Sequence, residues 1–359
     1  MGGRFSKKLE GAELGLTFDD VLVIPCYSEV HPAEADLSTK VSRRVGLETL
    51  LVSSPMDTVT ESEMAIALGR HGGIGIIHRS LGVEEQAQEV KKVKERGLKV
   101  GAAVGVFDYK RVKALVDAGV DVIVIDTAHA HSKDVLESLV EYKRMYDVDI
   151  VAGNIATPEA AEALIERGAD GLRVGIGPGS ACLTRKVSGV GVPQLYAIAS
   201  VADVASEYEV PVIADGGIKC SGDIVKAVVA GADCVMIGNL FAGTDEAPGE
   251  VVEIRGEKFK KYRGMGSEEV IRKLDRYSKL VPEGVSGWVP YKGSVEGVIK
   301  DLIGGVKSGM GYVGARNLKE LKEKGKFIRV TALGGNENRP RNLLIKGRAG
   351  ITYLNEGFK

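Results

Sequence analysis

From residue 50 onwards the chain alternates between short apolar runs and charged segments whose apolar residues recur with helical spacing. The apolar runs, each typical of a strand buried on both faces, cover residues 50–53, 73–77, 99–104, 120–125, 149–152, 171–174, 211–214 and 234–237. The segments with helical spacing cover residues 61–71, 83–96, 109–118, 133–146, 158–167, 195–208 and 221–230. Several of them end on glycine, which is common just after a helix.

This order of elements predicts an α/β fold with parallel strands, because parallel neighbours need a long crossover, usually a helix. Eight such strands close a (β/α)8 barrel, or TIM barrel, and the length of the alternating region suits that fold. A doubly wound open sheet is the alternative. It is less favoured because its nucleotide loop follows the first strand, whereas the glycine-rich loop of this chain follows the sixth.

Polar residues and glycines gather where the predicted strands end. In a TIM barrel those ends form one face, on which active sites are built. The segments concerned are residues 53–57, 78–79, 126–132, 153–154, 175–177, 215–217 and 238–239. The loops after the seventh and eighth strands of this fold often hold a phosphate group, and here they are residues 215–217 and 238–239. The sequence therefore predicts a phosphorylated ligand.

The loop after the sixth strand carries the strongest candidate chemistry. Gly175, Gly177 and Gly179 allow backbone N–H and C=O groups to turn towards a ligand, and Cys182 follows three residues later. Reactive thiols lie in polar, partly exposed surroundings of this kind, and a buried structural cysteine is the alternative. We expect Cys182 to be a nucleophile.

The regular alternation breaks after the eighth strand. Residues 241–293 are rich in Gly, Lys, Arg and Tyr, and we interpret this long irregular insertion as an active-site lid. Helical spacing returns over residues 295–309 and 315–324, and residues 331–359 are expected to form a C-terminal arm. The chain, residues 1–359, is thus expected to be a single catalytic domain.

Composition narrows the function classes. The 359 residues include 48 Lys and Arg against 49 Asp and Glu, a net charge of −1, which argues against a nucleic acid or membrane surface bound by bulk charge. No apolar run approaches the length of a transmembrane helix. The 4 cysteines have neither metal-ligand spacing nor the density of a disulfide framework, so a reducing, cytoplasmic location is expected.

The glycine-rich loop, the strand ends and the region after the eighth strand together resemble the IMP dehydrogenase/GMP reductase family. The most specific matches are residues 55–61, 175–184 and 189–194. The two branches of this family run opposite chemistry in one barrel. Dehydrogenases convert IMP and NAD to XMP, and reductases convert GMP and NADPH to IMP and ammonia.

Residues 126–132, 245–249, 262–266, 282–284 and 308–312 look like the dehydrogenase branch, so IMP oxidation is the predicted reaction. GMP reductase stays as the alternative for several reasons. The chain lacks the regulatory CBS pair that most dehydrogenases insert after the second β/α unit, and its lid is short. Glu268 and Asn239 depart from the usual dehydrogenase residues, and the tail only partly matches the segment expected to complete a K⁺ site.

The resemblance assigns catalytic roles to Cys182, Thr184, Arg276, Tyr277 and Glu283. Cys182 would attack C2 of the purine, hydride would pass to the nicotinamide of NAD, and water would hydrolyse the thioimidate that remains. Arg276 and Tyr277 match the lid pair that activates this water, while Thr184 with Glu283 resembles a second proton path.

The same resemblance implies ligands and assembly. IMP would be bound by Ser54, Met56, Ser180, Asp215, Gly216, Gly217, Gly238, Asn239, Tyr262, Gly264, Met265, Gly266 and Glu283. NAD would be bound by Asp126, Asn154, Arg173 and Gly175. The carbonyl groups of Gly177, Gly179 and Cys182 resemble the ligands of a monovalent cation, K⁺. Family members form homotetramers, so a homotetramer is expected here.

Overall fold

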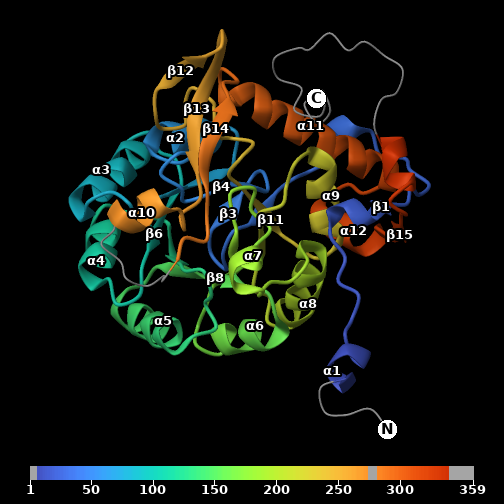
Figure 1. The fold of residues 1–359 in the computed structure, drawn as a ribbon, viewed down its shortest axis with the longest axis horizontal. Coiled ribbons are helices and arrows are strands. Elements are labelled where there is room, and N and C mark those ends of the chain that lie inside the picture. The colour runs from blue at the N-terminus through green and yellow to red at the C-terminus, as the bar shows by residue number, and fades with distance from the viewer. Residues whose placement is uncertain (1–5, 274–280, 339–359) are drawn as a thin grey trace.

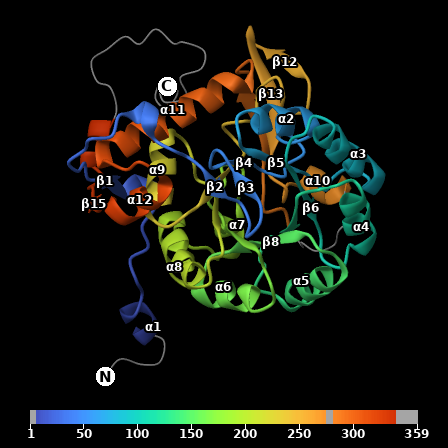
Figure 2. The ribbon, with the colours of Figure 1, turned by 180° about the vertical axis from the view of Figure 1, so that it is seen from behind.

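The computed structural model describes residues 6–273 and 281–338. Within those residues eight parallel strands close into a barrel in the order β10-β11-β4-β5-β6-β7-β8-β9 (Figures 1 and 2). The strands are β4 (Leu51–Ser53), β5 (Ile74–Ile77), β6 (Val100–Val104), β7 (Val122–Asp126), β8 (Asp149–Ile155), β9 (Gly171–Val174), β10 (Val212–Asp215) and β11 (Cys234–Ile237). The predicted (β/α)8 barrel is confirmed, and because the sheet closes on itself the open doubly wound alternative is wrong.

Helices surround the barrel (Figure 2). In chain order they are α2 (Ser62–Arg70), α3 (Val83–Lys94), α4 (Tyr109–Asp117), α5 (Lys133–Met145), α6 (Pro158–Ile165), α8 (Gln194–Glu207), α9 (Ser221–Val229), α11 (Val295–Val313) and α12 (Leu318–Lys324), whereas the short α7 (Thr184–Ser188) lies inside the ring in Figure 1. The boundaries follow local chemistry. At α6 the Thr157 side chain accepts the N–H of Ala160, Pro158 occupies the first turn, and Gly168 adopts a φ of 90° beyond the end.

The barrel strands are buried on both faces, apart from a partly exposed Asp215 at the end of β10, which is why the sequence shows apolar runs instead of alternation. One set of side chains packs on the helices and another fills the interior. The interior set comprises Val52, Ile74, Ile76, Ala103, Val122, Val124, Val151, Ile213, Cys234 and Met236. A hairpin of β2 (Thr39–Lys40) and β3 (Gly46–Leu47) adds Val41 and Leu47 to this interior cluster. The hairpin thereby covers the end of the barrel where strands begin and leaves the opposite end for ligands.

A buried carboxylate fastens that hairpin region to the barrel. Asp149, at the start of β8, has a side chain only 1% exposed and pairs with Arg44 Nε at 2.5 Å. It also accepts from Ser42 Oγ at 2.7 Å and from the Arg44 backbone N–H at 2.8 Å. Burial by itself raises the pKa of Asp149, but the hydrogen bonds and charge of Arg44 together with Ser42 outweigh it and hold the pKa below its ordinary value.

Asp149→Asn is expected to lower the free energy of unfolding at pH 7 by about 1–3 kcal/mol, because charged hydrogen bonds to a buried group are lost. Since the folded pKa is depressed, the carboxylate contributes stability above its unfolded pKa of about 3.9 and loses it as pH falls through the folded value. Denaturant titrations from pH 7 to pH 3 should therefore show the wild-type advantage shrinking at the acid end. A difference that stays constant over this range would contradict the assignment.

The region after β11 is more regular than predicted. The expected irregular insertion contains a three-stranded antiparallel sheet in the order β12-β13-β14, which stands at one side of the barrel, at the top of Figure 1. Its elements are β12 (Val251–Ile254), β13 (Glu257–Arg263), α10 (Glu268–Lys273) and β14 (Ser286–Pro290). Because charged side chains lie on both faces of β13, its sequence does not alternate between apolar and polar residues as a half-buried strand usually does.

Among the remaining elements, one strand pair brings the N-terminal and C-terminal parts of the described chain together. Strand β1 (Val21–Val23) pairs antiparallel with β15 (Phe327–Arg329), and α1 (Ser6–Glu10) lies away from the barrel (Figure 1). Short 3-10 turns cover Phe18–Asp20, Pro32–Glu34 and Gly334–Asn338. The predicted arm, residues 331–359, is described only as far as residue 338. Among the described helices, none combines the length and apolar character that a bilayer crossing requires.

Candidate active site

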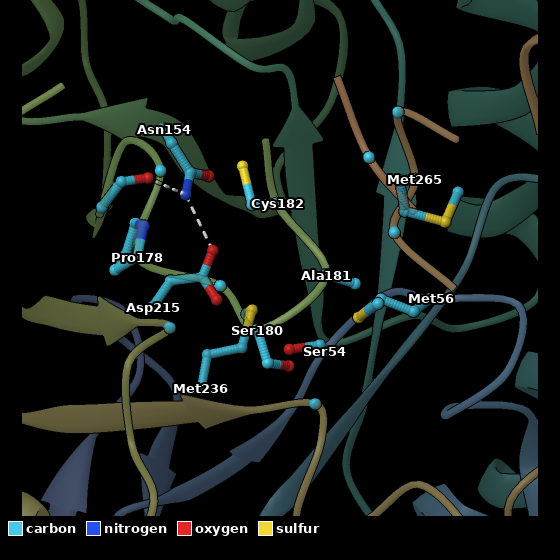
Figure 3. Close-up of a pocket in the computed structure, with 18 of the residues that line it drawn as sticks. Ser54, Met56, Asn154, Pro178, Ser180, Ala181, Cys182, Asp215, Met236 and Met265 are labelled. Atoms are coloured by element: carbon cyan, nitrogen blue, oxygen red, sulfur yellow. Dashed lines mark hydrogen bonds between the residues drawn. The ribbon is translucent and has the colours of Figure 1, made fainter. Parts of the chain in front are cut away.

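A cavity of about 1310 Å³ opens where the barrel strands end. Its walls come from the loops after the strands, from β13 and from the segments on either side of β14. Figure 3 shows Asn154 facing Asp215, with Ser54 and Ser180 close together and Cys182 further along the loop that carries Ser180. The volume exceeds the roughly 300–1,000 Å³ of a typical small-molecule site.

The loop between β9 and α7 depends on glycine at two positions. Gly175 has a φ of 149°, and a side chain there would collide with the carbonyl oxygen of Asp215. Gly177 has a φ of 86° and lies against the Arg185 side chain. The Cys182 N–H donates to the Gly179 carbonyl at 3.0 Å, closing a turn that presents the partly buried thiol to the cavity.

Cys182 begins a short chain of hydrogen bonds. Its thiol donates to Thr184 Oγ1 at 3.2 Å, and the Thr184 hydroxyl donates to Glu283 Oε2 at 2.9 Å. Thr184 opens helix α7, whereas Glu283 comes from the segment before β14, 99 residues further along the chain. A proton that leaves the thiol or a water beside it therefore has a path to a carboxylate.

Backbone hydrogen bonds tie the cysteine loop to the segments around α10. The Leu183 N–H donates to the Glu283 carbonyl at 2.7 Å, and the Val285 N–H donates to the Ala181 carbonyl at 3.0 Å. The Glu283 N–H in turn donates to the Gly266 carbonyl at 3.0 Å. The segment after β13 thus helps to fix the position of the thiol.

Glycine backbone and hydroxyl groups gather on the side of the cavity near β4, β10 and β11, where they could contact an anion. Gly216, Gly217 and Gly238 offer backbone surface there, and a side chain on Gly238 would press on the Met56 sulfur at 3.0 Å. Tyr262 is buried, and its hydroxyl lies 3.3 Å from Ser180 Oγ. Burial raises the pKa of Tyr262, so its hydroxyl stays protonated and can donate.

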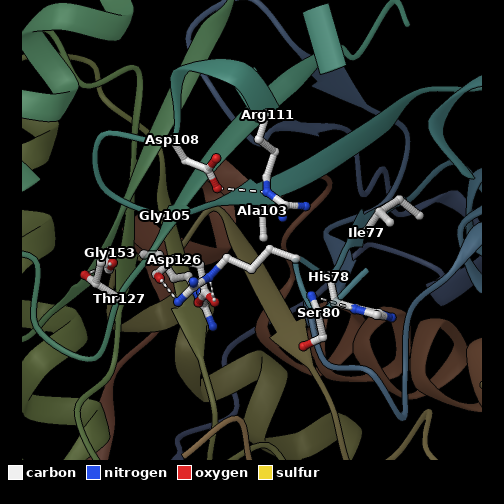
Figure 4. A network of polar contacts seen from close by, with 12 residues as sticks. Ile77, His78, Ser80, Ala103, Gly105, Asp108, Arg111, Asp126, Thr127 and Gly153 are labelled. Atoms are coloured by element: carbon white, nitrogen blue, oxygen red, sulfur yellow. Dashed lines mark hydrogen bonds and ion pairs between the residues drawn. The ribbon is translucent and has the colours of Figure 1, made fainter. Parts of the chain in front are cut away.

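A buried network of charges crosses the other side. Arg173 on β9 donates from Nη1 to Asp126 Oδ1 at 2.5 Å and from Nε to Asp215 Oδ2 at 2.9 Å. Asn154 donates to the same Asp215 oxygen at 2.7 Å, and Arg79 donates to the Asp126 carbonyl at 3.0 Å. Figure 4 shows Asp126 within this network of polar contacts.

The network keeps Asp126 ionised. Burial by itself raises the pKa of this carboxyl, but the charges of Arg173 and Arg79, with their hydrogen bonds, outweigh it and hold the pKa below the ordinary value. Arg173 shares its guanidinium between Asp126 and Asp215 and therefore couples the two halves of the cavity.

A family model described as the IMP dehydrogenase / GMP reductase domain matches residues 15–341. The chain belongs to this family. The IMP dehydrogenase/GMP reductase assignment rests on nearly the whole chain, including the cysteine loop, both phosphate-type loops and the segment that carries Glu283.

Relatives with dehydrogenase names cover most of the chain. It is 45% identical to inosine-5'-monophosphate dehydrogenase of Cryptosporidium parvum, an alignment that covers 92% of this chain and 96% of the relative. Identity is 42% to the protein of that name from Aquifex aeolicus, with 93% and 97% covered. The chain is 39% identical to the protein of that name from Methanocaldococcus jannaschii, in an alignment that covers 96% of this chain and 98% of the relative.

The alignments also bear on the predicted absence of a CBS pair. The Aquifex aeolicus alignment extends over 474 positions, more than the 359 residues of this chain, whereas the Cryptosporidium parvum alignment extends over 383. In this structure α3 ends at Lys94 and β6 begins at Val100, which leaves no room for a subdomain at this point.

The structure brings the predicted site residues together around one cavity. Its lining includes Ser54, Met56, Asp126, Asn154, Arg173, Gly175, Gly177, Gly179, Ser180, Cys182, Thr184, Asp215, Gly216, Gly217, Gly238, Asn239, Tyr262, Gly264, Met265, Gly266 and Glu283. Arg276 and Tyr277 lie outside the described residues.

Four cations that line the cavity have no predicted role: Arg79, Arg185, Lys219 and Lys292. Arg79 lies just after a barrel strand, so its position in the sequence alone places it on the face that carries the candidate active site. Arg185 lies beside the cysteine loop and donates to the carbonyl groups of Ile176 and Val192. No sequence pattern identifies Lys292, because its partners are more than 49 residues away.

Proposed function

We propose that this protein oxidises inosine 5′-monophosphate to xanthosine 5′-monophosphate with reduction of NAD, through a covalent intermediate on Cys182. One observation carries the proposal. The hydrogen bonds that link Cys182, Thr184 and Glu283 lie in a cavity, between the proposed phosphate side and the charged network around Arg173. The dehydrogenase names of the relatives support oxidation of IMP over the alternative, reduction of GMP.

In this proposal the nucleotide lies along the cavity from β11 to the cysteine loop. Its phosphate contacts Ser180, Tyr262 and the backbone of Gly217 and Gly238, where N–H groups suit an oxyanion. The ribose hydroxyl groups bind Asp215. The base reaches Cys182, with its edge held by the Met265 backbone and by Glu283.

The chemistry then follows from the thiol. Sulfur forms a bond to C2 of the purine, and the thiol proton leaves through the Thr184 hydroxyl towards Glu283. NAD, when bound, supplies the acceptor for the hydride that departs from C2. Water then adds to C2 and the C2–sulfur bond breaks, so that IMP, NAD and water yield XMP, NADH and a proton.

The dinucleotide side is assigned to Asp126, Asn154, Arg173 and Gly175. Because Asp126 stays ionised, it can accept hydrogen bonds from ribose hydroxyl or carboxamide groups of NAD. The proposed lid, residues 241–293, would cover this side. Arg276 and Tyr277 are proposed, from the sequence, to activate the water.

A monovalent cation fits the cysteine loop in part. No cluster of three or more His, Cys, Asp or Glu side chains suited to a metal ion occurs within residues 6–273 and 281–338. Backbone carbonyl oxygens are, however, the donors that K⁺ prefers. The carbonyl of Gly179 already accepts one N–H and keeps a second lone pair. We propose that the Gly177, Gly179 and Cys182 carbonyl groups hold K⁺, within a cytoplasmic homotetramer.

Product analysis tests the proposed function. Purified protein is incubated with IMP and NAD in K⁺ buffer, and separately with GMP and NADPH, and the nucleotides are separated by ion-pair chromatography. XMP is expected from the first mixture and no IMP from the second. Formation of IMP and ammonia from GMP, with no XMP from IMP, would make the protein a reductase.

Replacing the middle member of the hydrogen-bond chain tests the proton path. Thr184→Val keeps the shape of the side chain but removes the hydroxyl that links Cys182 to Glu283. We expect kcat to fall about a hundredfold, the lower end of acid–base contributions, while IMP binding is retained. Thr184→Ser, which keeps the hydroxyl, should stay within about threefold of wild type. Equal losses in both variants would contradict the proton path.

A further inference from the structure

Lys292 follows β14 and reaches under the loop that begins after β11. Its ammonium group donates to the carbonyl oxygens of Asn239 at 2.8 Å, Leu240 at 3.0 Å and Ala242 at 2.8 Å. Three carbonyl oxygens account for all three ammonium donors. Lys292, Asn239 and Leu240 all line the cavity on its proposed phosphate side.

These contacts orient the loop. In a trans peptide the C=O of one residue and the N–H of the next point in opposite directions. Because the Asn239 carbonyl binds Lys292, the Leu240 N–H lies on the other side of that peptide. Among the described residues no acceptor pairs with the N–H of Asn239 or of Leu240. Two donors are therefore left for a ligand.

The charge of Lys292 is also uncompensated within the described part of the chain. Other cations that line the cavity are paired: Arg79 and Arg173 with Asp126, and Lys219 with Asp19. Arg185 has no carboxylate partner among the described residues either, but it donates to the carbonyl group of Ile176 in the cysteine loop and to that of Val192 beyond α7. Burial without a counter-ion lowers the pKa of Lys292 to about 8.

We propose that Lys292 is a positioning residue for the substrate phosphate: its ammonium group holds the loop after β11 in the anion-binding conformation and supplies the positive charge that the phosphate dianion requires. This inference rests on the proposed function, since it assigns a phosphorylated ligand to this side of the cavity. A bound dianion also supplies the counter-charge that the buried ammonium lacks.

Lys260 offers a matched control. It lies on β13, is buried, and donates to the Thr244 carbonyl at 2.9 Å and to the Ala247 carbonyl, further along the same loop. It does not line the described cavity. Loss of Lys260 removes a buried ammonium from the same loop without removing a charge from the phosphate side.

Binding of IMP and of inosine, which lacks the phosphate, separates a role at the phosphate from a general structural role. Titration calorimetry on Lys292→Met and Lys292→Gln should show the Kd for IMP raised by about tenfold or more, the effect of losing one nearby charge in a partly desolvated site. The Kd for inosine should stay within about twofold. Lys260→Met should lower the melting temperature and leave the IMP-to-inosine ratio of Kd values unchanged.

Several results would overturn the inference. If Lys292→Met weakens the binding of IMP and of inosine equally, the role of Lys292 is merely structural. The same follows if Lys260→Met also changes the ratio of the two Kd values. If neither neutral variant folds, Lys292→Arg decides, because it keeps the charge and should keep the ratio within about threefold. If the wild type turns over IMP but the Lys292 variants keep its ratio of Kd values for IMP and inosine, this inference alone is wrong. If the Lys292 variants change that ratio but the wild type does not turn over IMP, the proposed reaction alone is wrong.

Discussion

Cys182→Ala is expected to lower kcat for IMP oxidation by at least about a thousandfold, because it removes the proposed nucleophile. The cysteine is partly buried at the end of a glycine-rich turn, and its thiol already donates to Thr184. IMP binding should change by less than about threefold, since the phosphate and ribose contacts lie elsewhere in the cavity. Steady-state absorbance at 340 nm measures the loss of turnover, and titration calorimetry measures the retained binding.

A second cysteine controls for general effects of the substitution. Cys26 is exposed and lies outside the cavity, so Cys26→Ala should keep wild-type activity. Acid quenching of wild type during turnover should also leave a nucleotide on the peptide that contains Cys182. A Cys182→Ala variant that keeps a tenth or more of the wild-type kcat would rule out covalent catalysis at this position.

Arg173→Met is expected to produce the largest loss of stability, about 3–5 kcal/mol in the free energy of unfolding, because it removes the shared cation and leaves Asp126 with Arg79 alone and Asp215 with the neutral Asn154. Arg173 pairs with Asp126 at 2.5 Å and with Asp215 at 2.9 Å, and its side chain is only 10% exposed. Guanidinium titration at fixed protein concentration, followed by circular dichroism, measures the change.

An exposed ion pair provides the comparison. Lys113 and Asp117 pair along the surface of α4 with side chains 64% and 61% exposed, so Lys113→Met should cost less than about 0.5 kcal/mol. Adding Asp215→Asn to Arg173→Met should recover part of the lost stability, because it removes the carboxylate whose ion pair is with Arg173. An Arg173→Met protein as stable as Lys113→Met would show that the buried network does not hold the two halves of the cavity together.

Much of the barrel could be predicted from the sequence because its strands are buried on both faces. Such strands read as apolar runs, and each charged segment between two runs had to be a crossover. The cysteine loop could be predicted for a related reason: positions such as Gly175, where φ is 149°, tolerate glycine almost alone.

The sheet β12-β13-β14 could not be predicted, because its stability depends on contacts that break the alternation rule. On β13 Lys260 is buried and binds carbonyl groups of the loop after β11, while its neighbours Lys258 and Lys261 are not buried. A lysine reads as a solvent-facing position unless its partners are known.

The partners within the site were equally hidden. Arg173 stands inside an apolar strand, which signals a buried charge, and the resemblance to the family implies a role on the dinucleotide side. Its bond to Asp215, 42 residues later, couples it to the substrate side as well. Two buried charges that are far apart in the sequence pair only because the barrel closes, so no periodic pattern in the sequence predicts the pair.

The reaction itself is tested most directly by absorbance at 340 nm with the intact protein in K⁺ buffer, run in both directions. With IMP and NAD we expect a rise in absorbance that is abolished in Cys182→Ala, and with GMP and NADPH we expect no change. A fall with GMP and NADPH, together with no rise from IMP and NAD, would contradict the proposed reaction and identify the cavity as the site of a reductive deamination.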